Sequence, residues 1–125
     1  MLTLSGTTRI FLAAEPVDMR NGFDGLAARV LGAGLDLYAG HIFVFVSKRR
    51  KHLKALAWDR NGLVVLFKRI EKGKFRLPEV PAGERTVAID ATELAMLLDG
   101  IDVRGVRRSA SWSPRRTGID AGIVL

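Results

Sequence analysis

Residues 41–77 constrain the fold of this chain more than any other segment. Their sequence, HIFVFVSKRRKHLKALAWDRNGLVVLFKRIEKGKFRL, alternates short apolar runs with turns rich in lysine and arginine. Short apolar runs bounded by turn residues are typical of β-strands, and Asn61-Gly62 and Lys72-Gly73 are turn signals. We therefore expect an antiparallel β-meander of about four strands. Its strands are expected at residues 42–47, 53–58, 63–70 and 74–77.

Two short helices and one or two further strands are expected outside the meander. Asp18 is predicted to be the N-cap of a first helix, because apolar residues recur at helical spacing from there to Leu31. Asp90 and Glu93 have the spacing of a capping box and predict a second helix that Gly100 ends. The further strands are expected at residues 9–14 and 86–89.

The length of 125 residues suits one domain with a hydrophobic core. We expect residues 1–104 to form a single α+β domain and residues 105–125 to form a flexible basic tail. The chain has no cysteine, which excludes disulfides and cysteine-ligated zinc. No apolar run approaches the roughly 20 residues that span a bilayer, and the N-terminus lacks the pattern of a signal peptide. The sequence therefore predicts a cytoplasmic protein with no membrane contact.

Positive charge is concentrated in the expected meander. Residues 48–76 hold eleven basic and two acidic side chains, an excess larger than the net charge of +7 of the whole chain. Residues 1–46 and 77–103 each carry more acidic than basic side chains. Successive corners of a meander lie at alternate ends of a sheet, so the corners at 48–51 and 71–74 are expected to share one end.

A basic rim of this kind indicates binding to a phosphate backbone, since each neutralised phosphate releases condensed counterions. The alternative is a solvated face that only keeps the protein soluble. The candidate nucleic-acid-binding residues are Lys48, Arg49, Arg50, Lys51, Lys54, Lys68, Arg69, Lys72, Lys74 and Arg76, with Arg107 and Arg108 in the tail. The aromatic residues of the meander favour a core role over a stacking platform, with Phe75 and Trp58 expected to be the more exposed ones.

The strong catalytic signatures are missing. The sequence contains no phosphate-binding glycine loop, no paired-histidine metal helix and no serine elbow. His41 and His52, the two histidines of the chain, are interpreted as a strand-end residue and a turn residue. We therefore expect no catalytic residue, no metal and no cofactor. A metal-dependent nuclease stays a distant alternative, because it would need two or three aspartates to converge on Mg²⁺. Its candidates are Asp18, Asp24, Asp59, Asp99 and Asp102.

Three segments in the same order also resemble a known family. They are EPVDMRNGFDGLA at 15–27, GHIFVFVSKRRKHLKALAWDRNGLVVLFKRIEKGKFRLP at 40–78 and LAMLLDGIDVR at 94–104. They are similar to the small accessory protein of the IS-sixty-six group of bacterial insertion sequences, usually called TnpB or the second open reading frame. The resemblance runs from about Arg9 to Arg108.

The resemblance implies a role in DNA transposition beside a separate transposase that is thought to carry the catalytic residues. Binding to DNA is inferred from charge placement, not from the resemblance. The main hypothesis is thus a non-catalytic accessory protein that binds DNA, the transposase of the same element, or both. The alternative is a protein-interaction module, in which the basic rim docks on an acidic surface of the transposase and the LLDGID helix supplies apolar contacts.

Overall fold

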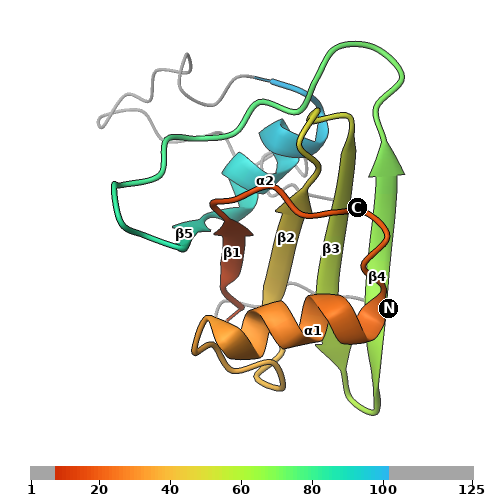
Figure 1. Cartoon of the computed structure of the whole chain (residues 1–125), viewed down its shortest axis with the longest axis vertical. Helices are drawn as coiled ribbons and strands as arrows, with labels where there is room; N and C mark the ends of the chain where they lie inside the picture. Colours follow the sequence, from red (N-terminus) through yellow and green to blue (C-terminus); the bar gives the residue numbers. More distant parts are fainter. Residues whose placement is uncertain (1–7, 102–125) are drawn as a thin grey trace, which may run out of the picture.

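The computed structural model describes residues 8–101 as five strands and two helices (Figure 1). The strands form one sheet in the order β4-β3-β2-β1-β5. All neighbouring strands are antiparallel except β1 and β2, which are parallel. This architecture confirms the expected α+β class. The elements are β1 (Ile10–Ala13), α1 (Phe23–Gly32), β2 (Ile42–Val46), β3 (His52–Asp59), β4 (Gly62–Arg69), β5 (Thr86–Ile89) and α2 (Ala91–Leu98).

Strands β2, β3 and β4 form the predicted meander. The β3–β4 turn differs from the prediction by one residue, because Gly62 already pairs with Asp59 as the first residue of β4. The turn residues are therefore Arg60 and Asn61, and Arg60 has the positive φ of 55°. A left-handed conformation at one central residue lets a two-residue loop follow the twist of the two strands.

The fourth meander strand expected at 74–77 does not form, so that prediction was wrong. Its backbone instead crosses to the β2–β3 corner, where the N–H of Phe75 donates to the carbonyl of Arg50 at 2.8 Å. The side chain of Phe75 is 0% exposed and packs in the core. Burial of this ring beneath the corner holds the segment away from β4, and Pro78 lacks the N–H that a ladder would need.

The two helices cover opposite faces of the sheet. Alternate residues of β2 point to opposite faces, so Ile42 and Val44 pack in the cluster that includes α2, and Phe43 packs in the cluster that includes α1. We refer to these as the α2 face and the α1 face. All five residues of β2 are buried. This agrees with the expectation, from its apolar residues on both faces, that the strand is central and covered.

Helix α1 begins at Phe23, with Gly22 as N-cap and no side-chain cap, so the prediction of Asp18 as N-cap was wrong. The carboxylate of Asp18 accepts from the backbone N–H of Arg20 at 2.8 Å, and its carbonyl accepts from the N–H of Asn21 at 3.0 Å. Asp18 therefore organises a tight turn that precedes the helix. Helix α2 has the predicted capping box, in which Asp90 accepts from the N–H of Glu93 at 2.7 Å.

Candidate nucleic-acid interface

The two basic corners lie together at one end of the sheet, as predicted. The N–H of Ile70 donates to the carbonyl of Lys51 at 2.9 Å, and that of Phe75 to the carbonyl of Arg50 at 2.8 Å. The ammonium of Lys51 donates to the carbonyl of Gly73 at 2.8 Å. These bonds fix the backbones of the two corners relative to each other before any ligand binds.

The first corner is a loop between β2 and β3 that Ser47 holds closed. The N–H of Ser47 donates to the carbonyl of His52 at 3.0 Å, and its hydroxyl accepts from the N–H of His52 at 3.1 Å. Arg50 takes the left-handed conformation, with φ of 60°, and its N–H donates to the carbonyl of Ser47 at 2.9 Å. The loop consequently presents Lys48, Arg49 and Arg50 to solvent.

The second corner turns at Gly73, which has a φ of 79°. The chain then runs extended, and neighbouring side chains of an extended chain point to opposite sides. Because Phe75 points into the core, Lys74 and Arg76 on either side of it point outward, and both are exposed. The buried ring therefore acts as the anchor that orients two cations.

Six exposed cations result, which we call the basic corner pair. Within residues 8–101 none of them takes part in the two ion pairs observed, which are Arg20–Asp18 and Arg69–Glu71. Their charges are therefore available to an anionic ligand. The members are Lys48, Arg49, Arg50, Lys72, Lys74 and Arg76.

Four other candidates from the sequence make polar contacts to other groups of the protein. Lys51 bonds Gly73 as described, and Lys54 is only 9% exposed. The ammonium of Lys54 donates to the carbonyls of Met19 and Asn21 at 2.9 and 2.8 Å and lies 4.7 Å from the centre of the Phe67 ring. It ties the turn before α1 to the sheet.

Lys68 and Arg69 complete this group. The ammonium of Lys68 donates to the carbonyl of Leu98 at 2.7 Å, at the C-terminal end of α2, where a cation is favourable. Arg69 is exposed but forms an ion pair of 2.8 Å with Glu71. The remaining candidates, Arg107 and Arg108, lie outside the described residues.

The aromatic side chains are placed differently from the prediction. Phe75 is buried, whereas Phe67 is the exposed aromatic residue of the meander. Trp58 is half-buried and makes an edge contact with Tyr38, with ring centres 5.0 Å apart. The rings therefore form no continuous stacking platform beside the basic corner pair within the described residues.

The histidines have structural contacts. His41 accepts from the N–H of Arg9 through Nδ1 at 3.0 Å, and its ring meets that of Phe11 edge-on. His52 pairs with Arg69 in the β3–β4 ladder. Within residues 8–101, no three histidine or carboxylate side chains come together in a way that could hold a metal ion.

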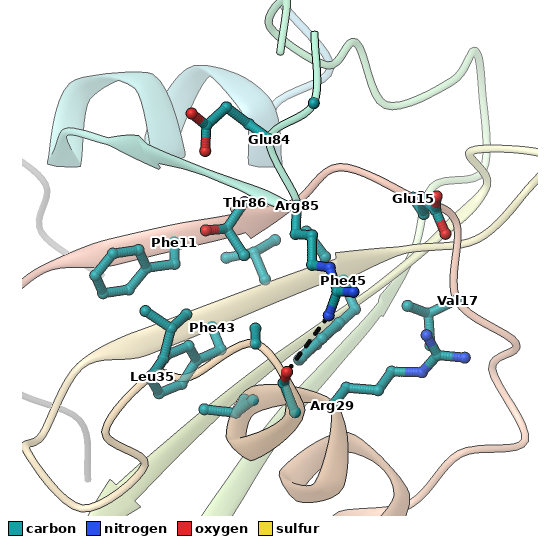
Figure 2. A pocket seen from close by; sticks show the side chains of 16 residues that line it. Phe11, Glu15, Val17, Arg29, Leu35, Phe43, Phe45, Glu84, Arg85 and Thr86 are labelled. Carbon is teal, nitrogen blue, oxygen red and sulfur yellow. Dashed lines mark hydrogen bonds between the residues drawn. The ribbon is translucent and has the colours of Figure 1, made fainter. Parts of the chain in front are cut away.

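Sequence reasoning missed a pocket of about 620 Å³ on the α1 face. Figure 2 shows Phe11, Phe43 and Phe45 lining it, and the rings of Phe11 and Phe43 stack with centres 5.7 Å apart. The guanidinium groups of Arg29 and Arg85 lie at its wall, and Arg85 donates to the carbonyl of Gly32 at 3.4 Å. The carboxylates of Glu15 and Glu84 also belong to the lining, so the pocket could hold an apolar group with polar neighbours.

No local sequence motif indicates this pocket, because its lining residues come from separate segments of the chain. Among the elements that contribute are β1, α1 and β2, together with residues 83–86. The alternating phenylalanines of β2 were visible in the sequence. That α1 covers only part of their face depends on tertiary structure.

The fold and the basic corner pair define a class of small α+β protein that concentrates cations at one end of its sheet. Within this class, the family model described as IS66 Orf2 like protein matches residues 8–108. The chain belongs to that family, which confirms the resemblance seen in the sequence. Its role is that of an accessory protein of insertion-sequence transposition, and the family is not a known class of enzyme.

Two relatives come from Sinorhizobium fredii strain NGR234. The uncharacterized protein y4jC is 38% identical over 117 residues, covering 93% of this chain and 98% of the relative. The uncharacterized protein y4hO is 34% identical over 119 residues, covering 94% and 100%. No solved structure matches the chain. None of the helices within residues 8–101 is long and apolar enough to cross a membrane.

Proposed function

We propose that this accessory protein binds the DNA of its insertion sequence through the basic corner pair. The observation that carries the proposal is the hydrogen-bonded union of the two corners, which holds six cations without ion-pair partners in the described chain at one end of the sheet. Such a surface neutralises phosphates and gains free energy from counterion release.

The proposed contacts position the protein on the duplex and carry little base specificity. Arginine and lysine side chains from loops contact phosphates irrespective of sequence. Preference for the ends of the element would therefore come from DNA shape or from the transposase. The proposal assigns phosphate contacts to the six members of the corner pair and not to Lys54 or Lys68, whose ammonium groups bond backbone carbonyls.

The test is a salt titration of binding to duplex DNA that carries the element's terminal sequence, with a scrambled duplex beside it. The variant Arg49→Ala/Arg50→Ala/Lys72→Ala removes three corner cations. We expect the slope of log affinity against log salt to fall by about 2.7, at about 0.9 per lost phosphate contact.

A matched control removes the same charge elsewhere, as Arg29→Ala/Arg60→Ala/Arg85→Ala. Arg60 lies at the opposite end of the sheet, and the other two lie at the pocket. The control is expected to retain the wild-type slope. Equal slopes for both triple variants would contradict a localised interface, and absence of binding at low salt would overturn the proposal for the isolated protein.

The second candidate is a module that docks on the transposase, and the pocket on the α1 face favours it. Its aromatic lining suits an apolar side chain, and polar groups of a partner could pair with the charges of the wall, which are the guanidinium groups of Arg29 and Arg85 and the carboxylates of Glu15 and Glu84. The LLDGID helix is a weaker candidate for apolar contacts, because Leu97 is buried and Leu98 packs against the core. Only Ile101 is strongly exposed among its apolar side chains that are described.

Purified transposase of the same element distinguishes the two candidates. If the pocket docks it, Arg29→Glu/Arg85→Glu should weaken transposase binding at least about ten-fold and leave DNA binding intact. Arg49→Glu/Arg50→Glu is the matched variant at the corner pair. If only that variant weakens transposase binding, the corner pair is the docking surface and the pocket is not.

A further inference from the structure

The sheet has one long free edge, at β4. In the described chain β4 pairs only with β3, and its eight residues, GLVVLFKR, contain no proline. The opposite edge strand, β5, has four residues. An unpaired strand presents a row of N–H and C=O groups, and natural proteins protect long edges with charge, proline or a covering element.

The protection expected of an edge strand is weak here. The charges near the end of β4 are engaged elsewhere, since Lys68 bonds the end of α2 and Arg69 pairs with Glu71. The middle of the strand is apolar on both faces. Leu66 is 47% exposed and points to the α2 face, and Phe67 is 54% exposed and points to the α1 face.

A third apolar side chain extends the patch on the α1 face. Phe23, at the start of α1, is 51% exposed. The preceding turn lies against β4, because Lys54 reaches both the carbonyl of Asn21 and the ring of Phe67. Figure 1 shows the beginning of α1 in front of β4. Half of the six large apolar side chains exposed in the described structure thus belong to this edge or to the start of α1 beside it.

We propose that β4 pairs antiparallel with β4 of a second copy of this chain, so that two sheets become one. A two-fold axis perpendicular to the sheet puts both α1 faces on the same side, and the patch of Phe23 and Phe67 then meets its own copy. The patch is self-complementary because it is apolar. Parallel pairing would instead bring two basic corner pairs together, and their like charges disfavour it.

The symmetry also limits the register. Residues opposite each other in an antiparallel ladder point to the same face, so a perpendicular two-fold axis must pass beside a residue that faces its own copy. The residues nearest the middle of β4 are Val65 and Leu66. If Val65 faces its own copy, Phe67 lies opposite Leu63 of the other copy. If Leu66 faces its own copy, Phe67 lies opposite Val65. Both are favourable cross-strand pairs of an aromatic and an apolar side chain.

Sedimentation equilibrium of the full chain tests the association. We expect a dimer in the micromolar range for the wild type. Leu66→Lys should raise the dissociation constant at least about ten-fold, because an edge lysine blocks strand pairing. Leu31→Lys is the matched control, since Leu31 is 54% exposed but lies at the far end of α1. A wild type that remains monomeric, or equal effects of the two variants, would overturn the proposal.

Cysteine cross-linking tests the direction of pairing, since the chain has no cysteine of its own. Single cysteines are introduced at Leu63, Val65, Leu66, Phe67 and Arg69, and oxidation follows once circular dichroism has shown native folding. Antiparallel pairing predicts a disulfide maximum at Val65 or Leu66 and a steep fall at both ends of the strand. Uniform cross-linking along β4 would indicate parallel strands and refute the proposed arrangement, as would no cross-linking at any position.

Discussion

Asp18 shows what the local environment does to a single carboxyl group. The side chain of Arg20 donates to it, at 2.7 Å for the shortest contact, and the N–H of Arg20 adds a backbone bond. These donors stabilise the charged form and lower the pKa of Asp18 to about 2, with the side-chain bond from Arg20 as the largest cause. The group that sequence reasoning assigned to a helix cap is thus part of an ion-paired turn.

We expect Arg20→Ala to raise the pKa of Asp18 toward its ordinary value of about 3.9, although residue 20 still donates its backbone N–H. Because the folded pKa is lowered, the stabilising effect of ionised Asp18 is present above the unfolded pKa and is lost as the pH falls through about 2. Carbon-detected NMR titration of the carboxyl group measures the pKa. Arg29→Ala should shift it less, and an unchanged value in Arg20→Ala would contradict the assignment.

Arg50 combines backbone strain with exposed charge. Its φ of 60° is unfavourable for a residue with a side chain, by roughly 1–2 kcal/mol, whereas glycine loses about 0.5–1 kcal/mol more backbone entropy on folding. We therefore expect Arg50→Gly to raise the free energy of unfolding by about 0.5–1 kcal/mol and to lower the salt slope of DNA binding by about 1. Urea denaturation and the salt titration measure the two effects.

Arg49→Gly is the matched control for that pair of measurements. Arg49 is exposed in the same loop but is not among the residues with positive φ. The Arg49→Gly variant should show a similar decrease in the salt slope of DNA binding without an increase in the free energy of unfolding. If Arg50→Gly is destabilised as much as Arg49→Gly, the left-handed position does not carry the strain assigned to it.

At the scale of elements, Lys54 joins β3 to the turn before α1. Its ammonium bonds two backbone carbonyls, and hydrogen bonds to charged groups are each worth about 1.5–3 kcal/mol. We expect Lys54→Met to lower the free energy of unfolding by about 3 kcal/mol or more, the low end of the sum for two such bonds, and to leave the salt slope unchanged. Lys48→Met should instead lower the salt slope and change the free energy of unfolding by no more than about 0.5 kcal/mol. Urea denaturation and salt titration separate the two lysines, and a lower slope in Lys54→Met would contradict its structural role.

Elements whose signals are local were predictable from the sequence. The capping box at Asp90 and Glu93 needs only neighbouring residues, and it is present as expected. The three strands of the meander follow from apolar runs and turns. The turn at Asp18 was not predictable in the same way, because the carboxylate could accept either from the first N–H groups of a helix or from a following arginine. In the structure it accepts from the backbone and the side chain of Arg20.

The candidate site was predictable only in part, for a related reason. The convergence of the corners follows from meander topology, and the backbone bonds between residues 50–51 and 70–75 confirm it. Which cations point outward depends on contacts distant in the sequence, and Lys54 and Lys68 reach carbonyls at residues 19 and 98. No charge count can separate these lysines from Lys48 or Lys72. The pocket and the free edge of β4 could not be predicted either, because both depend on which distant segments lie side by side.

At the scale of the whole molecule, strand order separates the proposed surfaces. Strand β1 adds beside β2 instead of β4, and β5 adds beside β1, so the meander keeps β4 as its outer strand. The basic corner pair lies at one end of the strands, and the free edge runs along their length. The pocket lies over β1 and β2 on the α1 face, and β3 separates these two strands from that edge. Contacts to DNA, to a second copy and to a partner protein would therefore not compete for the same residues.

The DNA-binding proposal and the dimer proposal together predict that the affinity for DNA depends on the length of the duplex. If two β4 strands pair with Leu66 facing its own copy, Glu71 stands opposite residue 61 of the second copy. The two corner pairs are then offset by ten residues, about 33 Å at roughly 3.3 Å per residue, and by about 40 Å in the register of Val65. One turn of duplex DNA is about 34–36 Å. A dimer would thus reach phosphates about one turn apart.

We therefore expect the wild type to gain at least about ten-fold in affinity, beyond the larger number of sites, between duplexes of roughly 10 and 25 base pairs. Leu66→Lys should lose most of this gain but keep the affinity for the short duplex, since each monomer retains its corner pair. Leu31→Lys should behave as the wild type. Fluorescence anisotropy at fixed salt measures all three. If Leu66→Lys dimerises poorly but keeps the full length dependence, the two copies do not engage DNA together, and each corner pair acts alone.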